Sequence, residues 1–161
     1  MKRRTFGLTA LLIGLAFWTN ALGAEGKLNP IGKFETGSRE LMVGTFTTSD
    51  GKDRVGLIAW RSGENRNAFA LRLDEWGAIF DLWQKAARAQ GRAWKAVGAI
   101  SETGTTDVSR IGFKSGPGVE VSVASPKGAS IAYVLQSADF ARFERAMRGM
   151  KAELEAGPAK K

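Results

Sequence analysis

The stretch from residue 55 to residue 83, VGLIAWRSGENRNAFALRLDEWGAIFDLW, decides the fold because its pattern occurs twice in the chain. Residues 119–147, VEVSVASPKGASIAYVLQSADFARFERAM, repeat it at an offset of 64 positions (119 minus 55). In both copies an alternation of apolar and polar residues, typical of a strand, changes at the same point to the spacing of a helix. The copies match in residue class more than in letters. The pattern predicts an internal duplication of a unit that ends in a helix.

Each copy predicts a meander of antiparallel strands that leads into one amphipathic helix. The helices begin near Asp74 and Ser137, which are residues that commonly cap a helix. Asp50-Gly51 predicts a hairpin turn between two strands of the first copy. Residues 27–38 fit either a leader segment or an edge strand. The other expected strands are 40–48, 54–61 and 67–73 in the first copy, and 94–100, 108–114, 119–124 and 130–136 in the second.

These elements predict an α+β fold in which two repeated antiparallel β-meander-plus-helix units, ββββα twice, pack as one domain. Repeat one would span about 38–90 and repeat two about 92–155, followed by a loose tail over 156–161. A unit of roughly 65 residues buries too little surface to be very stable on its own. Each unit offers a helix and a sheet face that the other could cover.

The first 24 residues have the three parts of a bacterial export signal. Lys2 to Arg4 form a positive start, Gly7–Trp18 is a short apolar run, and Ala21–Ala24 offers small residues for cleavage. Arg3-Arg4-Thr5-Phe6 also resembles the core of a twin-arginine signal. We therefore expect a cleaved signal over 1–24, a domain over 25–161, and a periplasmic or secreted protein. The apolar run is shorter than the ~20 residues that span a bilayer, so no transmembrane anchor should remain after processing.

Composition narrows the chemistry that the chain can perform. It has 24 basic and 16 acidic residues, no Cys and no His. Cysteine nucleophiles, Ser-His-Asp triads and Cys/His zinc sites are therefore excluded. No calcium-binding loop pattern is present either. We expect a protein without cofactor, metal or catalytic residues. Loss of residues 1–24 would remove three positive charges and leave a net charge of 21 − 16 = +5.

The duplication also points to a candidate binding face on the strand 54–61. Val55, Leu57 and Ala59 match valines in the second copy, so they should face the core. The opposite face is solvated in the second copy, yet it carries Ile58 and Trp60 here. These two side chains could cover a second layer, form a contact between copies of the chain, or present a stacking surface to a ligand.

The leading site hypothesis combines that face with nearby cations. The proposed binding residues are Arg54, Ile58, Trp60, Arg61 and Arg66. A secondary basic stripe on the last helix comprises Arg142, Arg145 and Arg148. The stripe could contact phosphates. We favour the simpler interpretation that it is a solvated helix face, supported by the spacing of Glu144 and Arg148.

The stretch Phe69–Trp76, FALRLDEW, followed by Ile79, resembles the junction of last strand and helix in the positive-cofactor-four coactivator family. Residues 133–140, YVLQSADF, keep that shape in the second copy. The whole duplicated pattern resembles the fold shared by the Whirly, Pur-alpha and positive-cofactor-four coactivator families, which bind single-stranded nucleic acid. The resemblance implies that a sheet face with basic and aromatic side chains contacts the nucleic acid. The matching positions are Arg54, Trp60, Arg61 and Arg66.

Two functional classes follow. The first is an exported, non-enzymatic binding or assembly module that acts on a protein or envelope partner and forms a homo-oligomer. The alternative is binding of single-stranded nucleic acid or another polyanion through the basic and aromatic sheet face. We predict the first, because the export signal separates the protein from cytoplasmic nucleic acid.

Overall fold

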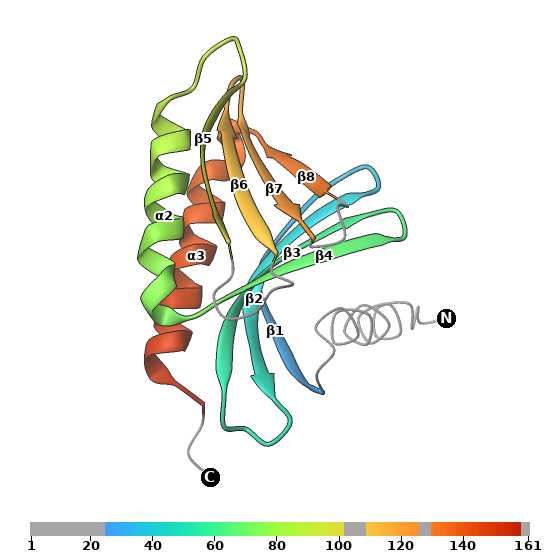
Figure 1. Ribbon diagram of the computed structural model, residues 1–161, viewed down its shortest axis with the longest axis vertical. Helices are drawn as coiled ribbons and strands as arrows, with labels where there is room; N and C mark the ends of the chain where they lie inside the picture. The colour runs from blue at the N-terminus through green and yellow to red at the C-terminus, as the bar shows by residue number, and fades with distance from the viewer. Residues whose placement is uncertain (1–24, 102–108, 126–129, 159–161) are drawn as a thin grey trace, which may run out of the picture.

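The computed structural model describes residues 25–101, 109–125 and 130–158. Eight strands form two four-stranded antiparallel sheets, and each sheet is followed by a helix (Figure 1). This confirms the predicted α+β fold with two repeated units. The first sheet consists of β1 (Gly26–Thr36), β2 (Arg39–Thr48), β3 (Arg54–Ser62) and β4 (Asn65–Leu71). The second consists of β5 (Lys95–Ser101), β6 (Arg110–Ser115), β7 (Val119–Ala124) and β8 (Ser130–Leu135). The helices are α2 (Leu73–Arg88) and α3 (Phe140–Ala156), the latter preceded by a short 3-10 turn, η1 (Ser137–Asp139).

The segment before β2 is an edge strand. β1 pairs with β2 from Gly26 to Thr36, with a bulge between Pro30 and Gly32. Proline suits this place because an edge strand leaves one side of its backbone without a partner strand. Of the two interpretations that the sequence left open for residues 27–38, the structure therefore shows the strand.

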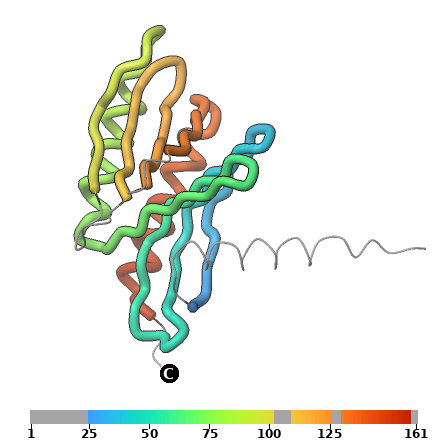
Figure 2. Tube along the Cα trace, turned by 45° about the vertical axis from the view of Figure 1, so that its right-hand side comes forward, coloured from blue at the N-terminus to red at the C-terminus, as the bar shows by residue number. Residues whose placement is uncertain are grey.

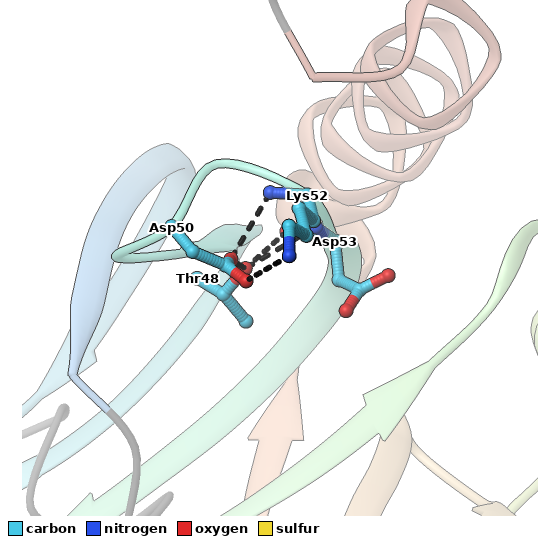
Figure 3. Close-up of polar contacts among 4 residues, drawn as sticks. All are labelled: Thr48, Asp50, Lys52 and Asp53. Carbon is cyan, nitrogen blue, oxygen red and sulfur yellow. Dashed lines mark hydrogen bonds and ion pairs between the residues drawn. The ribbon is translucent and has the colours of Figure 1, made fainter.

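The turn between β2 and β3 is held by side chains as well as by backbone (Figure 3). The Thr48 hydroxyl donates to the Asp50 carboxylate at 2.6 Å, and the Lys52 backbone N–H donates to the same oxygen at 3.1 Å. These hydrogen bonds, that from Thr48 foremost, hold the pKa of Asp50 below its usual value. Gly51 has φ 70°, a left-handed conformation that glycine adopts without strain. The predicted Asp50-Gly51 turn is thus present.

Each helix covers the sheet of the other repeat. α3, which follows the second sheet, packs on β1, β2 and β3 of the first sheet. α2, which follows the first sheet, packs on β5 and β6 of the second (Figures 1 and 2). The Ser115 hydroxyl of β6 donates to the Ala86 carbonyl of α2 at 2.7 Å. Because the helices are exchanged in this way, neither repeat has a complete core of its own.

The two sheets also contact each other directly, through β3 and β4 on one side and β7 and β8 on the other. The buried Trp60 indole N–H donates to the Val121 carbonyl at 2.9 Å. The Asn67 amide donates to the Val123 carbonyl at 3.2 Å. One continuous hydrophobic core therefore joins both sheets and both helices. A smaller cluster lies on the other face of the first sheet and contains Leu28, Met42, Leu57 and Ala59.

Glycine positions allow a test of this packing. A Cβ added at Gly32 in β1 would lie 2.5 Å from the Ala146 Cβ of α3, whereas one added at Gly77 in α2 meets nothing within 4 Å. Gly32→Ala should lower the free energy of unfolding by about 1–3 kcal/mol because it overpacks the β1–α3 contact. Gly77→Ala should raise it by about 0.5–1 kcal/mol because alanine favours the helix. Urea denaturation of both variants checks this; a neutral Gly32→Ala would contradict the close approach of α3 to β1.

Three of the tryptophans that the structure describes are buried, and they provide a second test. The indole N–H groups of Trp60 and Trp76 donate to backbone carbonyls, at 2.9 Å and 2.8 Å respectively. That of Trp83 is buried and has no partner among the described residues. Phenylalanine at each position removes a similar volume, but only the first two changes remove a hydrogen bond. Trp60→Phe and Trp76→Phe should therefore each cost about 1–2 kcal/mol more than Trp83→Phe in thermal or urea denaturation. Equal losses at all three positions would contradict this assignment.

Candidate functional site

The predicted binding residues do not share one face of the first sheet. We call the face toward α3 and the second sheet its inner face, and the opposite one its outer face. Arg54, Ile58 and Trp60 alternate onto the inner face, and Trp60 lies opposite Asn67 of β4. Arg61 is the next residue along β3, so it points to the outer face, where it lies opposite Arg66. The structure therefore divides the predicted site into two groups.

Ile58 and Trp60 are core residues. Both are 0% exposed, because β7 and β8 of the second sheet pack against this part of the first. Of the alternatives left open by the sequence, the structure shows the second layer. The prediction that these side chains present a stacking surface to a ligand is therefore wrong for this structure.

Arg54 connects the first sheet to the end of α3. Its Nε donates to the Thr47 hydroxyl at 3.1 Å, and its Nη1 donates to the Glu153 carbonyl at 3.2 Å. The Glu153 carboxylate in turn accepts hydrogen bonds from Asn29 and Thr45 of the first sheet, at 2.6 Å and 2.5 Å. Arg54 is thus part of a polar contact between β1, β2, β3 and α3, and its guanidinium is occupied there.

The outer face of the first sheet carries a row of charges across the strands. The nearly buried Glu40 carboxylate forms ion pairs with two cations. Its Oε2 lies 2.9 Å from the Arg61 Nη2 and 3.3 Å from the Lys33 Nζ. Lys33 also pairs with Glu35 at 2.7 Å. The hydrogen bond to Glu35 raises the pKa of Lys33, and the same bond lowers the pKa of Glu35, so both stay charged at neutral pH. Arg61 is accessible here, but two carboxylates offset much of the local positive charge.

The basic residues of α3 do not form one stripe. Arg142 pairs with Asp139 at 3.4 Å and lies over the Phe34 ring of β1, 4.5 Å from its centroid. Arg148 pairs with Glu144 at 2.8 Å and lies over the Phe80 ring of α2, 4.9 Å away. The two guanidinium groups therefore contact different sides of the core. Arg145 is exposed between them. Cation–π contacts and ion pairs within the fold occupy two of the three members of the phosphate-binding stripe that was the less favoured interpretation.

The second sheet offers a different kind of surface. The face away from the core carries small side chains, and alternation along its strands places Arg110 and Lys114 among them. Lys114 pairs with Glu120 at 3.1 Å. Sequence reasoning missed this surface because small residues give no apolar or charged signal. Its small residues, all at least partly exposed, include Ala96, Ala99, Gly112, Ser122 and Ala132.

Two kinds of site are absent from the part of the chain that the structure describes. No group of three or more His, Cys, Asp or Glu side chains is placed to hold a metal ion there. No helix of that part is long and apolar enough to cross a membrane.

Comparison with known proteins gives no match to a family model and none to a curated protein sequence. The structure does match solved structures. WHY1 from Arabidopsis thaliana is 16% identical, with a TM-score of 0.50 over 80% of this chain and 91% of that one. The plant transcriptional regulator PBF-2 is 13% identical, with a TM-score of 0.51 over 83% of this chain and 85% of that one. The chain has a Whirly-like fold. The resemblance inferred from residues 69–79 and 133–140 is thereby confirmed at the level of fold.

The comparison also corrects the main functional prediction. A fold shared with a transcriptional regulator contradicts an exported module for a protein or envelope partner, and fits the nucleic-acid alternative better. The predicted signal peptide and the periplasmic or secreted location conflict with the same finding, because transcription takes place inside the cell. Residues 1–24, on which that prediction depended, lie outside the described residues.

The charge row on the first sheet generates a prediction with two readouts. Glu40→Gln removes the carboxylate shared by Lys33 and Arg61 while keeping its shape. The free energy of unfolding should fall by about 1–3 kcal/mol because two charge-assisted interactions are weakened. Affinity for a single-stranded oligonucleotide should rise, because one negative charge is removed from an accessible face and Arg61 loses its ion pair, while Lys33 keeps its pairing with Glu35. Denaturation and fluorescence anisotropy measure the two effects. An affinity that stays unchanged would remove the outer face of the first sheet from the interface.

Proposed function

We propose that this protein is a non-enzymatic binder of single-stranded nucleic acid. The observation that carries the proposal is the placement of both helices on the inner side of a Whirly-like pair of sheets. This placement leaves the outer face of the second sheet accessible. An open sheet face suits a single strand, whose bases are unpaired and whose phosphates follow an extended path.

Charge supports a polyanionic ligand. The chain has a net charge of +8, with 24 basic and 16 acidic residues. With no His and no Cys, its side-chain charge changes little across the neutral pH range. Binding through phosphates releases counterions from the nucleic acid, so its affinity falls as salt rises. A contact made through apolar side chains would not show this dependence.

The cations of the outer faces have different expected roles. Arg61 and Arg66 belong to the first sheet, where Glu35 and Glu40 lie in the same row. Arg110 and Lys114 belong to the second, where Glu120 pairs with Lys114. Around Arg110 and Lys114 the neighbouring side chains are small, so a phosphate backbone could approach the sheet closely. We expect the second sheet to provide the main contact, because Arg61 and Arg66 lie on the face of the first sheet that points away from it.

A titration with labelled oligonucleotides tests the proposal. The full chain should bind a 20-nucleotide single strand at low salt, and the logarithm of its affinity should fall linearly with the logarithm of salt concentration. The double variant Arg110→Ala/Lys114→Ala should weaken binding and reduce that slope by about 0.7 for each phosphate that is no longer bound. Fluorescence anisotropy over a salt series measures both quantities.

The matched control is Lys52→Ala, which removes an exposed cation from the β2–β3 turn and should leave the slope unchanged. A duplex of the same sequence and heparin serve as competitors. Stronger competition by heparin or duplex than by the single strand would contradict a single-strand binder. No binding of any oligonucleotide at low salt would refute the proposal.

A further inference from the structure

Trp94 is an exposed tryptophan at one corner of the second sheet. It is 44% exposed, and among the described residues only it and Leu73 are large hydrophobic side chains with such exposure. It immediately precedes β5, whose Ala96 lies opposite Lys114 on the outer face. Trp94 lies just outside β5, and its ring lies against Gly116, the residue that follows β6. An aromatic side chain thus stands beside the surface proposed to bind the nucleic acid.

The indole ring rests on a glycine that is itself held in place. A Cβ added at Gly116 would lie 2.6 Å from the Trp94 Cδ2 atom and 2.7 Å from its Cε3 atom. Gly116 is fixed by two backbone hydrogen bonds: its carbonyl accepts from Gly91 at 3.0 Å, and its N–H donates to Gly118 at 2.9 Å. The ring is therefore supported by backbone on one side while nearly half of the side chain stays open. A supported ring loses little conformational freedom when a ligand binds.

The segment of chain around Trp94 is basic. Residues 82–101 contain Lys85, Arg88, Arg92 and Lys95, and no Asp or Glu. All four cations are exposed, and none of them forms an ion pair within 4.0 Å with another described residue. An exposed ring in a basic segment of the chain is complementary to a base flanked by phosphates. It is poorly suited to an apolar protein segment, which would have to desolvate those charges.

We propose that Trp94 is the stacking platform for one base of the single strand, with the exposed Arg92 binding a neighbouring phosphate. This inference rests on the proposed function and assigns it an aromatic contact. Any base presents a flat aromatic face, so the site selects single strands over duplexes without reading sequence. The glycine support at Gly116 is part of the site because a larger residue there would displace the ring.

Variants of the full chain test the platform with a 12-nucleotide oligothymidine. Trp94→Ala should weaken binding about 10-fold to 100-fold, the loss expected for one base–aromatic stack, and Trp94→Phe should recover part of it. Gly116→Ala keeps the tryptophan but moves its ring, so its affinity should also fall. Leu73→Ala, at the other exposed hydrophobic side chain, is the matched control and should bind like the unmodified chain.

An oligonucleotide of the same length made only of abasic sites separates stacking from phosphate binding. The unmodified chain should bind it more weakly than oligothymidine, and Trp94→Ala should bind both equally. If the unmodified chain binds oligothymidine and Trp94→Ala matches it, the platform is refuted while the proposed function stands. If the unmodified chain binds neither strand at low salt, both are refuted.

Discussion

The exchange of helices between the two repeats is the constraint on which the rest of the structure depends. A sheet must bury an apolar face against another element. Here that element is the helix of the other repeat: α3 packs on the first sheet and α2 on the second. α2 and α3 also pack on each other, with Trp76 donating to the Met147 carbonyl at 2.8 Å. Both helices therefore lie on the inner side of the sheets. The outer face of the second sheet remains accessible as a direct result of this arrangement.

Much of the fold could be predicted because the duplication repeats two simple periods. Alternation in residues 55–59 and 119–123 indicates strands, and the spacing of Trp76, Ile79 and Trp83 indicates a helix. The match of Leu57 and Ala59 to core valines of the second copy predicted the wrong face of β3 for the main core, because Ile58 and Trp60 face it instead. Leu57 and Ala59 on one face and Ile58 and Trp60 on the other are all 0% exposed. When both faces of a strand are apolar, alternation no longer distinguishes inside from outside, and only the position of the second sheet does so.

The candidate site was harder to predict because a cation's position in the sequence says little about its availability. Arg54, Arg142 and Arg148 belong to the residues that attract attention by charge, yet each is used in a contact within the fold. Guanidinium groups serve this purpose well, since they donate to carbonyls and lie over aromatic rings. Trp94 and its neighbours form no recognisable motif. The Trp94 ring lies against Gly116, 22 positions away (116 minus 94), and no local pattern in the sequence connects the two residues.

The order in which the chain is made gives the helix exchange a consequence during synthesis. When the first repeat has left the ribosome, α2 has no second sheet to cover, and the inner face of the first sheet has no α3. Phe34 packs on Phe143 of α3, with 5.8 Å between the ring centroids. It stays uncovered until α3, the last helix of the described chain, has been made. The nascent protein therefore exposes apolar surface until nearly the whole domain has been translated. Such a chain depends on rapid completion, or on protection by chaperones, more than one whose halves fold in turn.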